Sequence, residues 1–236
     1  MVINKQEISN NEFYSIYKRN ENNDIDCFLQ KESPVIVIGG VSNGSSISNY
    51  LKKYSKPFIY GFEPNPNLTI ALKSKFTKEN VALHFNAIGD KDIAINFNIF
   101  DHAPSSSILN STKVGKKYYG SRYEIKETVI VDQVRLDSVL SNKNIDILKL
   151  DLQGYELEAL KGCKDIFNNI KIITLEIAFI MAYENQSLFS DIDLFLRKHN
   201  FRLFNFSSLW HAKGGQLVSG DALYLNNRVF RKDIKC

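Results

Sequence analysis

The sequence predicts an α/β protein with a mostly parallel sheet and helices on both of its faces. Short apolar runs without alternation, at residues 35–38, 145–150 and 170–175, are typical of strands that are covered on both sides. Residues 45–54 and 188–199 carry apolar side chains at helical spacing. Strands that alternate with helices indicate parallel pairing, and such sheets bind ligands at the carboxyl ends of their strands.

Composition supports one large domain. The chain has 236 residues, 44% of them hydrophobic and 24% charged, with a net charge of +4. This charge is too small for a nucleic-acid footprint, and no apolar run is long enough to span a membrane. The three cysteines lack the spacing of a zinc site or a disulfide framework, so we expect a reduced, cytoplasmic protein. Residues 1–30 are expected to form a helical cover, broken at 20–24 and available for a homodimer, and residues 31–230 the main domain.

The stretch from Pro34 to Pro64 contains a strand, a glycine-rich turn, a helix and a second strand that ends in an acid. Gly39 and Gly40 allow backbone amides to approach a ligand closely. Glu63 lies where an acid commonly binds the two hydroxyls of a ribose. We interpret the stretch as the adenosine-binding half of a nucleotide or S-adenosylmethionine fold. The alternative is an ordinary turn followed by a surface glutamate.

The remaining elements follow from the same patterns. Further strands are expected at residues 58–62, 81–85, 94–100, 129–134, 201–206 and 222–225. Further helices are expected at residues 65–76, 136–140 and from 152 to Gly162, with residues 86–90 as a loop.

Residues 101–128 form a long segment without a regular pattern. Loops of this length inside a compact domain tend to be functional lids or mobile segments. Lys116, Lys117 and Arg122 lie among three tyrosines, a composition that suits a phosphorylated or nucleotide-linked sugar. A solvated basic loop is the alternative.

Three apolar strands are each followed by a carboxylate, and these acids meet at one edge of a parallel sheet. Besides Glu63, they are Asp151 and Glu176. Asp151 is a candidate to accept a proton from a substrate hydroxyl, and Glu176 is a candidate second carboxylate on the substrate side. His102 and His211 are alternative bases, because the ordinary pKa of histidine lies near neutrality.

The segment LKLDLQGYELEALKG, residues 148–162, resembles the signature of the FkbM family of S-adenosylmethionine-dependent methyltransferases. Five other segments resemble family motifs and occur in the family's order. They are GFEPNPN at 61–67, NAIGD at 86–90, a serine-containing segment at 105–109, RLDSVL at 135–140 and GDALYLN at 220–226. The resemblance covers roughly residues 34–226.

The resemblance implies a Rossmann-like methyltransferase fold with a mostly parallel seven-stranded sheet and S-adenosylmethionine as cofactor. The residues that it implies for cofactor binding are Gly39, Gly40, Asn43, Glu63, Asn86, Ile88 and Asp151. Our candidates for the group that takes the acceptor's proton are Asp151, Glu176 and His102. A divalent cation between Asp151 and Glu176 is conceivable, but no metal-ligand spacing indicates one. For Glu156, a catalytic role and a role at the start of a helix both stay open.

One position departs from the family pattern. The first loop of the family usually begins with an acid, and this chain has Val37 there. We therefore carry three interpretations. The main one is an O-methyltransferase acting on a hydroxyl of a small molecule or sugar, with surface-polysaccharide biosynthesis as its context. The alternatives are a degenerate, non-catalytic binding domain and an N-methyltransferase.

Overall fold

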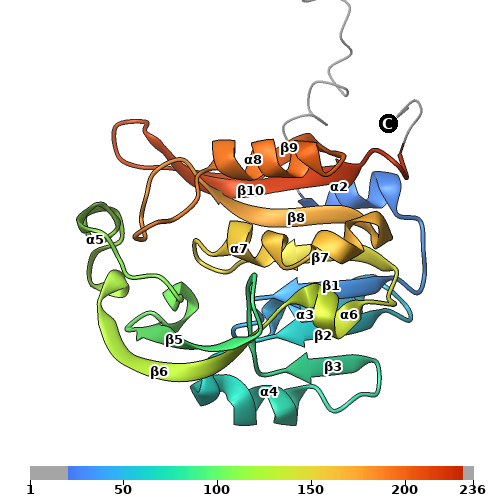
Figure 1. Cartoon of the computed structure of the whole chain (residues 1–236), viewed down its shortest axis with the longest axis horizontal. Helices are drawn as coiled ribbons and strands as arrows, with labels where there is room; N and C mark the ends of the chain where they lie inside the picture. Colours follow the sequence, from blue (N-terminus) through green and yellow to red (C-terminus); the bar gives the residue numbers. More distant parts are fainter. Residues whose placement is uncertain (1–20, 231–236) are drawn as a thin grey trace, which may run out of the picture.

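The computed structural model describes residues 21–230, with side chains from Asp24 onward, and its main feature is a seven-stranded sheet (Figure 1). The strands of this sheet are β1 (Val35–Gly39), β2 (Phe58–Phe62), β3 (Val81–His84), β7 (Ile145–Leu150), β8 (Ile170–Ala178), β9 (Phe201–His211) and β10 (Leu217–Asn226). They are ordered β3-β2-β1-β7-β8-β10-β9. β10 is antiparallel to both of its neighbours, and the other adjacent pairs are parallel. The predicted Rossmann-like methyltransferase fold is confirmed.

Helices cover both faces of the sheet, as predicted (Figure 1). One face packs against α2 (Glu21–Phe28), α3 (Ser45–Lys53) and α4 (Thr69–Lys75), and the other against α6 (Leu136–Leu140), α7 (Glu156–Lys161) and α8 (Phe189–Lys198). Alternate residues of β1 enter the two cores: Ile36 and Ile38 pack with the first group, and Val37 packs with the second. Side chains of a strand alternate between faces, which explains why β1 is apolar throughout.

The helix α2 departs from the prediction. Most of the helical segment expected at residues 6–30 lies outside the described residues. The break expected at residues 20–24 is wrong where the structure describes it, because α2 begins at Glu21 and runs through it. Asp24 is buried in this helix and accepts a hydrogen bond from Asn205 Nδ2 at 2.8 Å. A contact with β9 therefore stabilises a polar stretch that local propensity disfavours.

A second sheet lies beyond the carboxyl ends of the parallel strands (Figure 1). It consists of β4 (Ala87–Ile88), β5 (Ile93–Phe100) and β6 (Ile125–Val134), in the order β4-β6-β5. The strand expected at 94–100 is confirmed as β5. The expected loop at 86–90 contains β4, and β6 begins four residues earlier than expected. Both differences follow from pairing with distant residues: β4 pairs with the end of β6, and β5 pairs with β6 as far as Phe100 and Ile125.

Residues 101–128 are ordered by tertiary contacts rather than left as a solvated loop. They contain two 3₁₀ turns, η2 (Ala103–Ser105) and η3 (Gly120–Tyr123), and the helix α5 (Lys113–Tyr119). Thr112 caps α5 through its side chain and donates its backbone N–H to Ala182 O at 2.9 Å. Gly115 lies so close to this loop that an added Cβ would be 2.2 Å from Ala182 O. The segment is therefore docked against the loop that follows β8.

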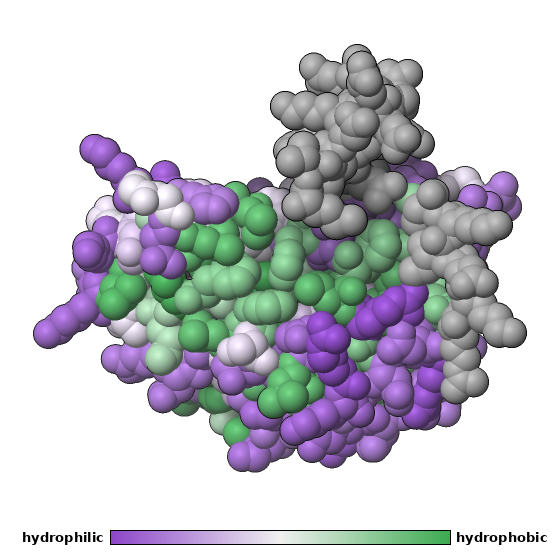
Figure 2. Space-filling model, turned by 90° about the horizontal axis from the view of Figure 1, so that it is seen from above, coloured by the Kyte–Doolittle hydropathy of each residue, from purple (hydrophilic) through white to green (hydrophobic). Residues whose placement is uncertain are grey.

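Two further 3₁₀ turns complete the fold: η1 (Pro66–Leu68) precedes α4, and η4 (Lys164–Asn169) precedes β8. Figure 2 shows apolar side chains gathered on the side of the molecule that carries α8 and the edge strand β9. Leu203, Phe204 and Phe206 of β9 are half-buried there. Among the described helices, none combines the length and the apolar character needed to cross a membrane.

Candidate active site

A cavity of about 130 Å³ lies at the carboxyl ends of β1, β2 and β7, and the strand order reverses direction between β1 and β7. Such switch points are the usual ligand sites of parallel sheets. The ends of β1, β2 and β7 form its floor, and residues 103–108 lie over it. Its polar lining includes Ser42, Glu63, Asn86, Ser106, Asp151 and Gln153.

Glu63 lies at one end of this cavity and is buried. Its two carboxylate oxygens accept separate backbone hydrogen bonds, Oε2 from Ser42 N at 2.7 Å and Oε1 from Asn65 N at 2.9 Å. Burial raises the pKa of Glu63, while the two N–H donors act against that rise. Each oxygen keeps a lone pair for another donor, so the carboxylate is held in place and still able to accept two hydroxyl hydrogens.

Gly40 brings the backbone of β1 close to the strand end at Asp151. Its φ of +80° belongs to the left-handed region, and an added Cβ would lie 1.9 Å from Asp151 O. Gly40 therefore has two separate reasons to be glycine. Gly39 and Asn43 do not line the cavity. Gly39 packs beneath it against Ile88 and Leu150, and the Asn43 side chain accepts the Ser45 N–H at the start of α3.

Three further residues predicted to bind the cofactor line the same cavity. Asn86, Ile88 and Asp151 all line the cavity, with Ile88 fully buried in β4. Val37, the residue that departs from the family pattern, is buried in the core and does not line the cavity.

The turn after β7 has two consecutive residues with positive φ, Gln153 at +53° and Gly154 at +96°. This turn delays the start of α7 to Glu156. The buried Glu156 accepts backbone hydrogen bonds from Leu152 at 2.7 Å and Gly154 at 3.3 Å. Burial raises its pKa to about 7. Glu156 thus holds the turn together, and the structural role left open by the sequence is the one that the contacts support.

Gln153 connects the two candidate catalytic carboxylates. Its Nε2 donates to Asp151 Oδ1 at 2.7 Å and to Glu176 Oε2 at 2.9 Å. Tyr183 Oη lies 2.9 Å from Gln153 Oε1. We expected Glu176 directly after a strand, but it lies inside β8. This strand continues to Ala178 because it pairs with β10. Burial, followed by the charge of Asp151, raises the pKa of Glu176 well above its ordinary value.

A second cavity, of about 570 Å³, adjoins the first at Gln153. Aromatic rings form much of its wall: Tyr119 stacks on Tyr123 with centroids 4.4 Å apart and on Trp210 at 5.0 Å. The lining is His102, Ser105, Tyr118, Tyr119, Arg122, Tyr123, Gln153, Glu176, Trp210 and Ser219.

Only one of the three basic residues predicted to bind substrate lines a cavity. Arg122 lines the second cavity, whereas Lys116 pairs with Glu124 at 2.8 Å and Lys117 lies over the Tyr118 ring. His102 lines the same cavity, with Nδ1 3.0 Å from Ser105 Oγ. His211 lies at the exposed end of β9 and lines neither cavity.

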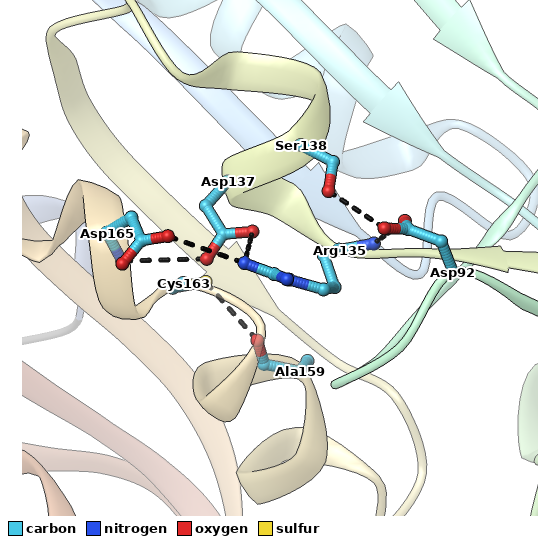
Figure 3. Close-up of polar contacts among 7 residues, drawn as sticks. All are labelled: Asp92, Arg135, Asp137, Ser138, Ala159, Cys163 and Asp165. Carbon is cyan, nitrogen blue, oxygen red and sulfur yellow. Dashed lines mark hydrogen bonds and ion pairs between the residues drawn. The ribbon is translucent and has the colours of Figure 1, made fainter.

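The RLDSVL motif is structural (Figure 3). Asp92, which precedes β5, accepts hydrogen bonds from Arg135 N at 2.8 Å and Ser138 Oγ at 2.9 Å at the start of α6. The Arg135 side chain pairs with the buried Asp137 at 2.7 Å and with Asp165 at 3.4 Å. The motif therefore links the second sheet, α6 and η4.

Sequence reasoning missed Gln153, Tyr183 and Trp210. Gln153 lies inside the recognised signature, which marked its position without indicating its contacts. Tyr183 and Trp210 are far away in sequence and carried no signal. Among residues 21–230, no group of three or more His, Cys, Asp or Glu side chains is arranged to hold a metal ion.

Residues 38–203 match the model of the methyltransferase FkbM domain. The chain belongs to the FkbM methyltransferase family. It is 25% identical to the 2-O-methyltransferase NoeI of Sinorhizobium fredii (strain NBRC 101917 / NGR234) over 167 residues, which are 67% of this chain and 69% of that protein. The prediction of an S-adenosylmethionine-dependent methyltransferase is thereby confirmed at the level of the family.

Similar solved structures also include methyltransferases. An rRNA methylase from Streptococcus thermophilus has a TM-score of 0.47 and 10% identity, over 87% of this chain and 93% of that one. The precorrin-6y C5,15-methyltransferase of Geobacter metallireducens GS-15 has a TM-score of 0.46 and 11% identity, over 95% and 94%. Because these scores lie below 0.5, the fold assignment depends on the strand order itself.

Proposed function

We propose that this FkbM-family protein transfers a methyl group from S-adenosylmethionine to a hydroxyl of a sugar or another small molecule. The observation that carries the proposal is the meeting of two cavities at a pair of carboxylates. Asp151 lines the first cavity, Glu176 lines the second, and Gln153 lines both. A methyl donor and an acceptor bound in the two cavities would approach each other beside these residues.

The first cavity fits the cofactor in its chemistry. Glu63 is held to accept both ribose hydroxyls, and Gly40 provides backbone where a Cβ would collide with Asp151 O. Asn86 and Ile88 offer a polar and an apolar contact for the adenine ring. Val37 lies away from both cavities, so its departure from the family pattern removes no group from their lining. When bound, S-adenosylmethionine supplies a methyl group activated by a positively charged sulfur.

The residues of the chain orient the acceptor and take its proton. Methyl transfer to oxygen would form one C–O bond while the bond between the methyl carbon and sulfur breaks, with S-adenosylhomocysteine as the leaving group, and the acceptor hydroxyl would release its proton to a nearby base. Glu176 and Asp151 are within reach of a group bound in the second cavity beside Gln153. Burial and the charge of Asp151 raise the pKa of Glu176, which suits it to accept a proton. His102, exposed at the same cavity, is the remaining candidate base.

The second cavity supports a sugar as acceptor. Trp210, the exposed ring at the end of the stack with Tyr119 and Tyr123, lines the cavity together with Tyr118, and aromatic faces pack well against the C–H face of a sugar ring. Arg122 offers a positive charge for a phosphate, which favours nucleotide-linked or phosphorylated sugars. The relative from Sinorhizobium fredii is named as a 2-O-methyltransferase, which also favours oxygen as the acceptor atom.

We include surface-polysaccharide biosynthesis and a cytoplasmic location in the proposal. A homodimer and the absence of a nucleic-acid partner stay predictions.

The test is methyl transfer to a panel of methyl glycosides and nucleotide sugars. The purified chain is incubated with isotopically labelled S-adenosylmethionine, and mass spectrometry identifies the product and the methylated position. We expect an O-methylated sugar with wild-type protein, and turnover reduced at least 100-fold in Asp151→Asn. Methylation at nitrogen would favour the N-methyltransferase alternative. A folded protein that binds no S-adenosylhomocysteine would favour the non-catalytic alternative.

A further inference from the structure

Gln153 connects the two candidate carboxylates with Tyr183 and with Ser107, which belongs to the segment between β5 and β6. Its amide contacts Asp151, Glu176 and Tyr183 within 2.9 Å. Its backbone oxygen accepts a hydrogen bond from Ser107 Oγ at 2.8 Å. We propose that Gln153 is a positioning residue, whose amide nitrogen holds Asp151 and Glu176 side by side while Tyr183 fixes the direction of the amide. The proposal rests on the proposed function, in which these carboxylates act on the acceptor.

The chemistry of an amide suits this role. Two carboxylates that share one site repel each other, and one of them usually takes up a proton to relieve the repulsion. The amide nitrogen of Gln153 carries two hydrogens, one for each carboxylate, and has no proton to release near neutral pH. It therefore joins Asp151 to Glu176 without neutralising either. The carboxylate that is to take the acceptor's proton therefore receives no proton from Gln153.

Tyr183 makes the orientation of the amide unambiguous. If the amide were flipped, Gln153 Oε1 would face two carboxylates, which is repulsive. In the observed orientation Oε1 faces the Tyr183 hydroxyl, which also lies 2.9 Å from Ser105 O. The Tyr183 ring is buried and packs against Phe100 and Tyr123, with centroids 6.0 and 5.0 Å away. Burial raises the pKa of Tyr183, so this hydroxyl keeps its proton for donation.

The backbone at Gln153 supports the same conclusion. A non-glycine residue with φ of +53° is disfavoured and persists where surrounding contacts hold it. Here the Ser107 contact holds the backbone, and three polar groups hold the side chain. Strain maintained in this way is concentrated at functional sites.

The proposal concerns protonation, so the neighbouring charges matter. The titratable and charged groups around the two carboxylates come from β7, α7, β10, the loop after β8 and the segment between β5 and β6. They are Lys149, Glu156, Asp221, His102, Arg122, Tyr119, Tyr123 and Tyr183. Lys149 lowers the pKa of Glu176, whereas Glu156 and Asp221 raise it. Removing the hydrogen-bond donor Gln153 would raise the pKa of Glu176 further.

The experiment follows the carboxylates directly by NMR. Protein labelled with ¹³C at the Asp and Glu carboxyl carbons is titrated with acid in the presence of S-adenosylhomocysteine. Gln153→Met keeps the length of the side chain and removes both donors. We expect the midpoint of Glu176 to rise by about one pH unit, a tenfold gain in proton affinity. Tyr183→Phe should raise it by a smaller amount, because the amide loses the contact of Oε1 with the hydroxyl and keeps its two contacts with the carboxylates. Gln216→Met, a change in the exposed β9–β10 connection, is the matched control.

The outcome separates this proposal from the proposed function. An unchanged midpoint for Glu176 in Gln153→Met would overturn the positioning role, whatever the variant's activity. A shifted midpoint with unchanged affinity for S-adenosylhomocysteine would support it. Wild-type protein that methylates nothing in the sugar panel would contradict the proposed function, while the titration would still report on Gln153. Thermal unfolding verifies that each variant folds. If Gln153→Met does not fold, Gln153→Asn, whose amide is too short to reach both acids, is titrated instead and should show the same rise.

Discussion

Replacing Glu63 by Gln should weaken S-adenosylhomocysteine binding by a predictable amount. The substitution keeps the shape of the side chain and exchanges one carboxylate oxygen for an N–H₂ group. In the wild-type protein the two oxygens face backbone N–H groups, of Ser42 at 2.7 Å and Asn65 at 2.9 Å. Whichever way the new amide points, its nitrogen faces one of these donors and also loses the capacity to accept from one ribose hydroxyl.

The magnitude follows from these contacts. A hydrogen bond to a charged group contributes about 1.5–3 kcal/mol, which corresponds to roughly 10- to 150-fold in affinity. The N–H left facing the amide nitrogen is unsatisfied, which costs about 1–3 kcal/mol of folding free energy. We therefore expect both a weaker complex and a lower melting temperature.

The assay is isothermal titration calorimetry of wild-type protein and Glu63→Gln with S-adenosylhomocysteine. Glu79→Gln, a change of an exposed acid before β3, is the matched control and should bind like the wild type. Thermal unfolding of the same samples shows whether the variant is folded at the temperature of the titration.

The pH dependence gives a second readout. Burial raises the pKa of Glu63, and only the ionised form accepts from both ribose hydroxyls. Affinity should therefore be full above this raised pKa and fall as the pH drops through it. Glu63→Gln has no such group and should lack that component of the pH dependence. A folded Glu63→Gln protein that binds within twofold of the wild type would refute the assignment of Glu63 to the ribose.

Three further perturbations test other parts of the structure. Gly115→Ala should lower the free energy of unfolding by about 1–3 kcal/mol in urea denaturation, because its Cβ would lie 2.2 Å from Ala182 O. As a control, Val114→Ala, on the exposed side of α5, should change the free energy of unfolding by less than about 0.5 kcal/mol. Asp146→Asn should be destabilising near neutral pH, because the buried carboxylate pairs with two lysines at 2.7 and 2.8 Å. These partners lower the pKa of Asp146, so its stabilising effect is present above the unfolded-state pKa and is lost as the pH falls through the lower folded-state pKa. In urea denaturation, the difference in unfolding free energy between wild type and variant should therefore be smaller at acid pH than at neutral pH. Gly40→Ala should abolish calorimetric binding of S-adenosylhomocysteine, and wild-type affinity in that variant would contradict the close approach to Asp151.

The sequence by itself determined the layered α/β architecture and part of the site. Strands such as β1 and β8 are apolar on both faces because helices cover both, and that pattern is visible locally. Glu63 and Asp151 could be assigned because each directly follows a strand, and parallel strands end at the same edge. Gly40 was recognisable for the same reason, as part of the turn after β1.

Tertiary structure decided the rest. Glu176 lies inside β8 rather than at its end because β10 pairs with it, and no local pattern reports that pairing. Residues 101–128 are ordered by contacts with Ala182 and Tyr183, which are more than fifty residues further along the chain. Gln153 acquires its role only where three distant segments converge on one amide. Local patterns encode which face and which end of an element a residue occupies, whereas the meeting of loops depends on strand order and long-range pairing.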